Sequence, residues 1–101
     1  MKKPPEGMVG ISTDKSILKV LNRKQIQQIV DVVGVKTLEE ISQVQHPNEN
    51  KPFDKNIAEL EGQHLDIMLT AISQVTGWKY MRVLGFASDL GKRLLILNKS
   101  R

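Results

Sequence analysis

The sequence predicts one compact, mainly α-helical domain, a bundle of four or five helices, and three observations lead to this fold class. The chain has 101 residues, which suits a single small domain, and 40% of them are hydrophobic, enough for a core. Apolar residues recur at spacings of three and four in several segments, which is the periodicity of amphipathic helices. Cysteine is absent, so packing or a second subunit must stabilise the fold without disulfides.

The chain is expected to divide into a flexible N-terminal arm, residues 1–13, and a single helical domain, residues 14–101. Prolines and glycines crowd the first ten residues and favour irregular backbone, although Met8, Val9 and Ile11 could add a short strand or pack into the core. A first short helix is expected from Lys15 to Asn22, with Asp14 in the N-cap position.

Two further helices follow before the middle of the chain. From Lys24 to Val33 the apolar residues share one face, and Gly34 ends the run where a left-handed residue is often needed. Thr37 followed by Glu40 has the spacing of a capping box, which predicts a third helix from Leu38 to about Gln45. Its inward-facing residues would be Leu38, Ile41 and Val44.

A polar segment with two prolines, residues 46–55, is predicted to form a mobile loop before the longest helix. That helix should run from Ile57 to Val75, where Asn56 with Glu59 gives a second capping pattern and only Gly62 interrupts a broad apolar stripe. At about 1.5 Å per residue it would be roughly 28 Å long, enough to cross the domain. We therefore expect the other helices to pack on it.

The last segment, Trp78 to Asn98, fits two structures. As a helix, its apolar residues form one stripe; as strands, residues 78–86 and 93–98 would make a C-terminal β-hairpin around a turn that contains Asp89 and Gly91. We favour the helix. The hairpin would give the domain a winged-helix-like ending.

Charge is distributed in blocks along the chain, with a net charge of +4. Basic residues predominate in residues 1–36, acidic residues in residues 37–76, and residues 77–101 hold six Lys or Arg against Asp89 alone. This pattern suits a protein that meets a polyanion with one surface, and equally a homodimer that pairs unlike blocks. Neither a membrane span nor a signal peptide is evident in the sequence, so we expect a cytoplasmic protein.

The stretch around the start of the last basic block carries a recognisable pattern. An apolar and a small residue, a turn glycine, and then further apolar residues are supplied in order by Ile72, Ser73, Gly77, Trp78, Val83 and Phe86. This segment resembles the helix-turn-helix of DNA-binding regulators. It departs from that motif at Thr76, where an apolar residue is usual, and at Gly85, which falls inside the second helix.

The resemblance implies a recognition helix that begins with Lys79, Tyr80 and Arg82, where these side chains could contact phosphates and base edges of double-stranded DNA. Basic residues nearer the C-terminus would add phosphate contacts, or line the tip of a wing in the hairpin alternative. The predicted nucleic-acid-binding residues are Lys79, Tyr80, Arg82, Lys92, Arg93 and Lys99. We therefore expect a small DNA-binding regulatory protein and a homodimer.

The alternative is a non-enzymatic helical module, an inhibitor or adaptor, that binds a protein partner through its acidic middle, including Glu39 and Glu40. An enzyme is not expected, because the sequence has no phosphate-binding glycine loop, no Ser-His-Asp order and no dinucleotide fingerprint. His46 and His64 are the only histidines and lack the spacing of metal ligands, so neither a metal nor a cofactor is expected.

Overall fold

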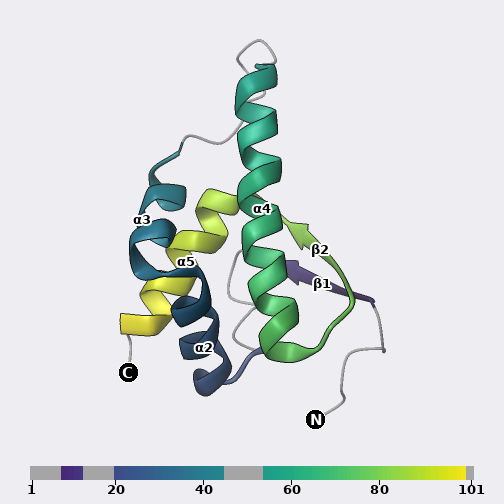
Figure 1. The fold of residues 1–101 in the computed structure, drawn as a ribbon, viewed down its shortest axis with the longest axis vertical. Coiled ribbons are helices and arrows are strands. Elements are labelled where there is room, and N and C mark those ends of the chain that lie inside the picture. The colour runs from purple at the N-terminus through teal and green to yellow at the C-terminus, as the bar shows by residue number, and fades with distance from the viewer. Residues whose placement is uncertain (1–7, 13–19, 45–53, 100–101) are drawn as a thin grey trace.

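The structure, a computed structural model, describes residues 8–12, 20–44 and 54–99 of the chain. Within these ranges the chain forms two short strands and four helices, so the predicted mainly helical fold is confirmed (Figure 1). In chain order the elements are β1 (Met8–Ser12), α2 (Arg23–Val33), α3 (Val35–Gln43), α4 (Lys55–Thr76), β2 (Tyr80–Leu84) and α5 (Ala87–Lys99).

Helix α2 follows its prediction closely and ends at Gly34, whose amide donates to the carbonyl oxygen of Val30 at 2.8 Å. It begins with a capping box that the sequence analysis did not identify. The Asn22 side chain accepts from the Gln25 amide at 2.8 Å, and the Gln25 side chain accepts from the Asn22 amide at 3.0 Å. Asn22 was expected to end a helix from Lys15, most of which lies outside the described residues.

The starts of α3 and α4 correct two predicted caps. Helix α3 begins at Val35, directly after Gly34, so Thr37 is already helical and makes no capping box. Helix α4 begins at Lys55, because the carboxylate of Asp54 accepts from two amides of the first turn, at 2.9 and 3.3 Å. A carboxylate also suits the positive end of a helix dipole, so Asp54 forms the cap in place of Asn56. Of the loop expected over 46–55, residues 46–53 lie outside the described ranges.

The C-terminal segment matches neither alternative in full. Residues 80–84 form a strand and residues 87–99 form a helix. The hairpin prediction is therefore wrong for residues 93–98, which are helical, and the helix prediction is wrong for the residues before Ala87. Strand β2 pairs in parallel with β1, from Met8 opposite Tyr80 to Ser12 opposite Leu84. Part of the segment expected to be a flexible arm is therefore a strand, and Gly85, at φ 141°, separates β2 from α5.

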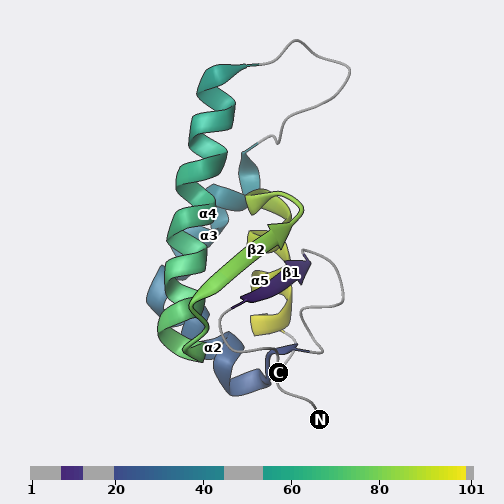
Figure 2. The same ribbon diagram turned by 90° about the vertical axis from the view of Figure 1, so that its right-hand side faces the viewer.

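Helices α2 and α5 share the centre of the core, because each of them contacts the other three helices, whereas α3 and α4 meet mainly through them. In α5, Ala87, Leu90 and Leu94 are fully buried, whereas the first half of α4 extends beyond the other helices (Figures 1 and 2). The expectation that every helix packs on α4 is thus corrected. No helix in the described ranges is both long and apolar enough to cross a membrane.

Helices α5 and α3 approach each other closely at Gly91. A Cβ atom at this position would lie 3.4 Å from the backbone oxygen of Leu38 and 3.5 Å from Cγ2 of Ile41. A methyl group would therefore fill the remaining space in van der Waals contact, and a larger side chain would push the two helices apart.

We predict that Gly91→Leu lowers the free energy of unfolding by about 1–3 kcal/mol, because the new side chain overpacks the contact between α3 and α5. Gly62→Ala is the matched control: Gly62 lies inside α4 with no atom near the position of a Cβ, so alanine should stabilise the helix by about 0.5–1 kcal/mol. Urea unfolding followed by circular dichroism measures both variants. A Gly91→Leu protein as stable as the wild type would contradict the close packing.

Candidate nucleic-acid interface

Helix α5 has two chemically different sides. Residues Ala87, Leu90, Gly91 and Leu94, spaced three and four apart, are buried against the other helices. The opposite side carries Lys92, Ile96 and Lys99, which share one helical face at the same spacings and are all exposed, Ile96 by 53%.

Positive charge predominates on the outer side of α5. Arg93 is half-buried next to Lys92, and Asp89 is the one carboxylate in the helix, near its start. Lys99 lies in the last turn, where a cation is favoured by the negative end of the helix dipole. Lys92 and Lys99 are seven residues apart, about 10 Å along the axis, so the cations form a row and not a cluster.

The start of α5 is fixed to α4 by a hydrogen bond between residues far apart in the sequence. Oε1 of Glu61 accepts from the amide of Ala87 at 2.6 Å. The first amides of a helix lack partners within the helix, and a carboxylate there is favoured by the helix dipole. Glu61 thus serves as a cap supplied from another helix, and it anchors the end of α5 from which the basic row begins.

Two more cations lie at the same end of the molecule as the last turn of α5. Arg23 and Lys24 are exposed in the first turn of α2, and the start of α2 lies beside the end of α5 in both Figure 1 and Figure 2. The sequence analysis counted both residues in the basic N-terminal block but assigned them no role. Their proximity to α5 depends on tertiary packing, which no local pattern gives.

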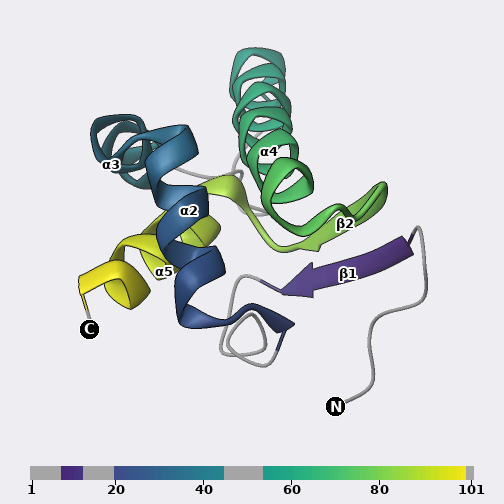
Figure 3. The same cartoon turned by 60° about the horizontal axis from the view of Figure 1, so that its bottom comes forward.

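The structure separates the six predicted binding residues into two groups. Lys79 is exposed in the turn before β2, Arg82 is exposed within β2, and the side chain of Tyr80 lies outside the described residues. Strand β2 and the C-terminal end of α5 lie on opposite sides of the molecule (Figures 1 and 3). Lys92, Arg93 and Lys99 therefore form one group on α5, and Lys79 and Arg82 belong to another surface.

The recognition helix that the helix-turn-helix resemblance implies is corrected to a strand. The expected turn is present at Gly77, which has left-handed backbone angles and donates to the carbonyl oxygen of Ser73 at 2.8 Å. After it, however, residues 80–84 pair with β1, with Met81 and Val83 packed against the core. Alternating inward and outward side chains suit a strand, and parallel pairing holds the segment extended.

Comparison with protein-family models, curated proteins and solved structures found no match for the chain. The comparisons therefore neither support nor oppose the helix-turn-helix resemblance. Among the described residues, no group of three or more His, Asp or Glu side chains is placed to hold a metal ion. The basic face of α5, formed by Lys92, Arg93 and Lys99, is therefore the candidate binding surface.

We predict that Glu61→Ala lowers the free energy of unfolding by about 1–2 kcal/mol, because the Ala87 amide loses its partner. Glu61→Gln keeps an acceptor oxygen without the charge and should cost less. Glu59→Ala is the matched control, since Glu59 is exposed on the same helix and has one weak ion pair, with Lys55 at 3.9 Å. Thermal unfolding of the three variants checks the order, and equal stabilities of Glu61→Ala and Glu59→Ala would contradict it.

Proposed function

We propose that this protein is a non-enzymatic, cytoplasmic DNA-binding regulator that contacts a duplex with the exposed face of α5. One observation carries the proposal: α5 buries its apolar side on three helices and presents Lys92, Arg93 and Lys99 on its outer side against the single carboxylate of Asp89. A helix held in this way keeps the backbone positions of its cations in a fixed row, so binding to phosphates orders only their side chains.

The dimensions of α5 suit a DNA groove. A helix is about 10–12 Å across with its side chains, and the major groove of B-form DNA is about 12 Å wide. Thirteen residues extend the helix over about 20 Å, so both of its ends would reach the flanking phosphates. Arg93 could pair with a guanine edge, and Ile96, an apolar residue among cations, could contact a thymine methyl group.

The first turn of α2 supports the same surface. Arg23 and Lys24 lie at the positive end of a helix dipole, and no acidic residue compensates them in that turn. Each such placement costs about 0.3–1 kcal/mol of stability. A nearby DNA phosphate would offset this repulsion, so two cations that weaken the isolated fold would strengthen the complex.

A homodimer fits this proposal. One α5 offers three cations, and two copies of the chain would double that number on one duplex. Two symmetric copies would also place their helices in successive major grooves, about 34–36 Å apart. Specific binding would then require a site with two half-sites.

We predict that the chain binds a labelled mixed-sequence duplex and that its affinity falls steeply between about 50 and 150 mM salt, because bound cations release counterions. The double substitution Lys92→Ala/Lys99→Ala should lower the slope of log affinity against log salt by about 2, one for each lost phosphate contact. Fluorescence anisotropy measures both quantities.

Two controls separate this surface from other lysines and arginines. Lys55→Ala removes an exposed lysine at the start of α4 and should leave the salt slope unchanged. Lys79→Ala/Arg82→Ala removes the two cations near β2 and should have a smaller effect than the pair on α5. Absence of binding at low salt, or a larger loss with the β2 pair, would refute the proposed interface.

We predict that Arg23→Glu/Lys24→Glu changes stability and binding in opposite directions. The acidic residues suit the start of α2, so the free energy of unfolding should rise by about 0.5–2 kcal/mol, while the affinity for the duplex falls. Chemical denaturation and anisotropy on the same samples measure the two effects. If the variant gains stability but keeps its affinity for the duplex, the first turn of α2 is not part of the DNA-binding surface.

The second candidate is a protein-interaction module that uses acidic surface. Glu39 and Glu40 are exposed on α3, and Ile67 on α4 is 43% exposed beside the exposed Asp66. An exposed isoleucine next to a carboxylate suits a basic, apolar partner helix. Salt-insensitive capture of a protein partner that is lost in Glu39→Lys/Glu40→Lys would favour this function over DNA binding.

A further inference from the structure

Strand β1 is attached to the described part of the domain almost entirely through β2. The two strands pair in parallel, with Met8 opposite Tyr80 at one end and Ser12 opposite Leu84 at the other. No other described element contacts β1 to a comparable extent, and β2 lies between β1 and α4 (Figures 2 and 3). An isolated pair of strands is at best marginally stable in water, so β1 depends on β2 for its position.

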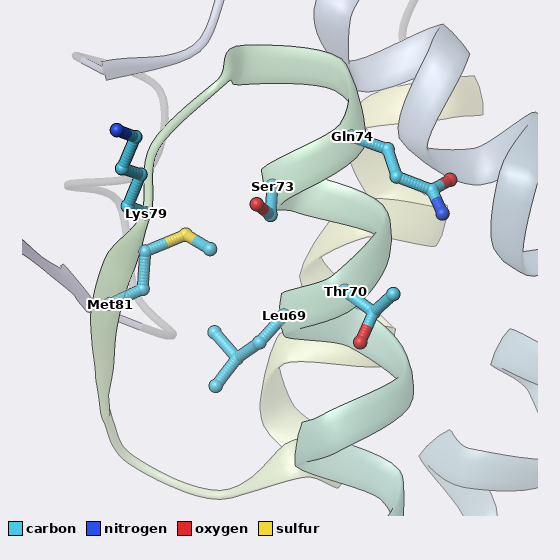
Figure 4. A pocket seen from close by; sticks show the side chains of 6 residues that line it. All are labelled: Leu69, Thr70, Ser73, Gln74, Lys79 and Met81. Atoms are coloured by element: carbon cyan, nitrogen blue, oxygen red, sulfur yellow. The ribbon is translucent and has the colours of Figure 1, made fainter. Parts of the chain in front are cut away.

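Strand β2, in contrast, is held from the side of α4. Its residues Met81 and Val83 pack against the core, and the side chains of Leu69 and Met81 fill the space between the helix and the strand (Figure 4). Lys79 is exposed and points away from this space. The edge of β2 that faces α4 is therefore covered, and the edge that pairs with β1 is the one at which a strand can be exchanged.

Hydrogen bonds also fix the chain on both sides of β2. Before the strand, the Ser73 hydroxyl donates to the carbonyl oxygen of Trp78 at 2.8 Å, and the Trp78 amide donates to Oγ1 of Thr76 at 3.2 Å. After the strand, Oε1 of Glu61 accepts from the amide of Ala87 at 2.6 Å. None of these bonds involves β1, so β2 would keep its position and its pairing edge if β1 left.

We propose that two copies of this chain exchange their N-terminal strands, so that β1 of each copy pairs with β2 of the other. The pairing within one chain shows that the sequence of β1 fits the edge of β2 in a defined register. The β1 of a second copy has the same sequence and would make the same backbone hydrogen bonds. Because reciprocal exchange keeps every pairing, it is a low-cost route to a dimer.

The connection from β1 to the core is long enough for this exchange. Leu21 is buried in the core with 4% of its surface exposed, and Ser12 precedes it by nine residues. Nine residues span up to about 30 Å when extended, and the two shorter dimensions of the molecule are 28 and 21 Å. Strand β1 can therefore reach β2 of a neighbouring copy while Leu21 stays in its own core.

Protein concentration decides between the closed monomer and the exchanged dimer. A strand tethered by a short segment is present at its own partner at an effective concentration on the order of 1 mM. A second copy competes with the tethered strand once the protein approaches that concentration. The exchange uses no residue of α5, so it does not rest on the proposed DNA binding.

A disulfide between two copies tests the exchange, because the chain has no cysteine of its own. Ser12→Cys and Leu84→Cys are made in separate proteins, since these positions are opposite each other in the register and Leu84 is 52% exposed. The reduced variants are mixed at about 1 mM, left to exchange and then oxidised with glutathione disulfide. Electrophoresis without reductant, followed by mass spectrometry, measures the heterodimer joined through positions 12 and 84.

We expect this heterodimer in about tenfold or greater excess over the matched control, in which Lys55→Cys replaces Leu84→Cys. Adjacent strands lie about 4.8 Å apart, within the range that a disulfide bridges. Lys55, in contrast, is exposed at the start of α4, far from β1 (Figure 1). A thiol at that position meets the thiol at position 12 only by random collision.

The double variant Ser12→Cys/Leu84→Cys gives a second readout. Oxidised in dilute solution, it closes the disulfide within one chain and ties β1 to its own β2. Light scattering should then find this locked protein monomeric at about 1 mM, where the wild type is partly dimeric.

Three outcomes would each overturn the proposal. They are a heterodimer no more abundant than in the control, a wild type that stays monomeric at this concentration, and a locked protein that dimerises as the wild type does. No DNA is present in either measurement, so these results are independent of whether the protein binds a duplex.

Discussion

The close approach of α5 to α3 at Gly91 is the contact on which the rest of the molecule depends. Because the position has no side chain, the backbones of the two helices meet, and Ile41 and Leu38 close over α5. Helices α2 and α4 then cover two more of its sides. With its apolar face enclosed, α5 has one side left for solvent, and the sequence places its cations there. The same contact therefore determines both the core and the chemistry of the surface.

The spacing of apolar residues predicted the helices that have a continuous apolar face. Helix α2 has four apolar residues on one face and a terminal glycine, and α4 has a long apolar stripe, so both were found within a few residues. Capping was less predictable, since several residues near Asp54 and Thr37 have side chains that could serve as caps. Strand β2 was ambiguous because its partner β1 lies near the other end of the chain. Nothing in residues 78–86 specifies that partner.

The candidate site also combines features that the local sequence predicts with features that depend on tertiary structure. Lys92, Arg93 and Lys99 could be named from the sequence as a basic block, but their common face follows only from a helix that begins at Ala87. Grouping them with Lys79 and Arg82 assumed that either ending, helix or hairpin, presents the basic block at one side of the domain. A strand followed by a separate helix instead sends the two groups to opposite sides. The part played by Glu61 was hidden for a similar reason, since its partner amide is 26 residues away.

The pairing of β1 with β2 has a consequence for how the molecule folds and opens. The strands can meet only after the chain between them has folded back, and closing so long a loop is entropically costly. Helices form from local contacts, so the sheet should assemble last in folding, after α2, α4 and α5 have packed. By the same reasoning, it is the first part to detach under native conditions, while the helices stay folded. Release of β1 would expose the edge of β2 with which it now pairs, without disturbing the face of α5.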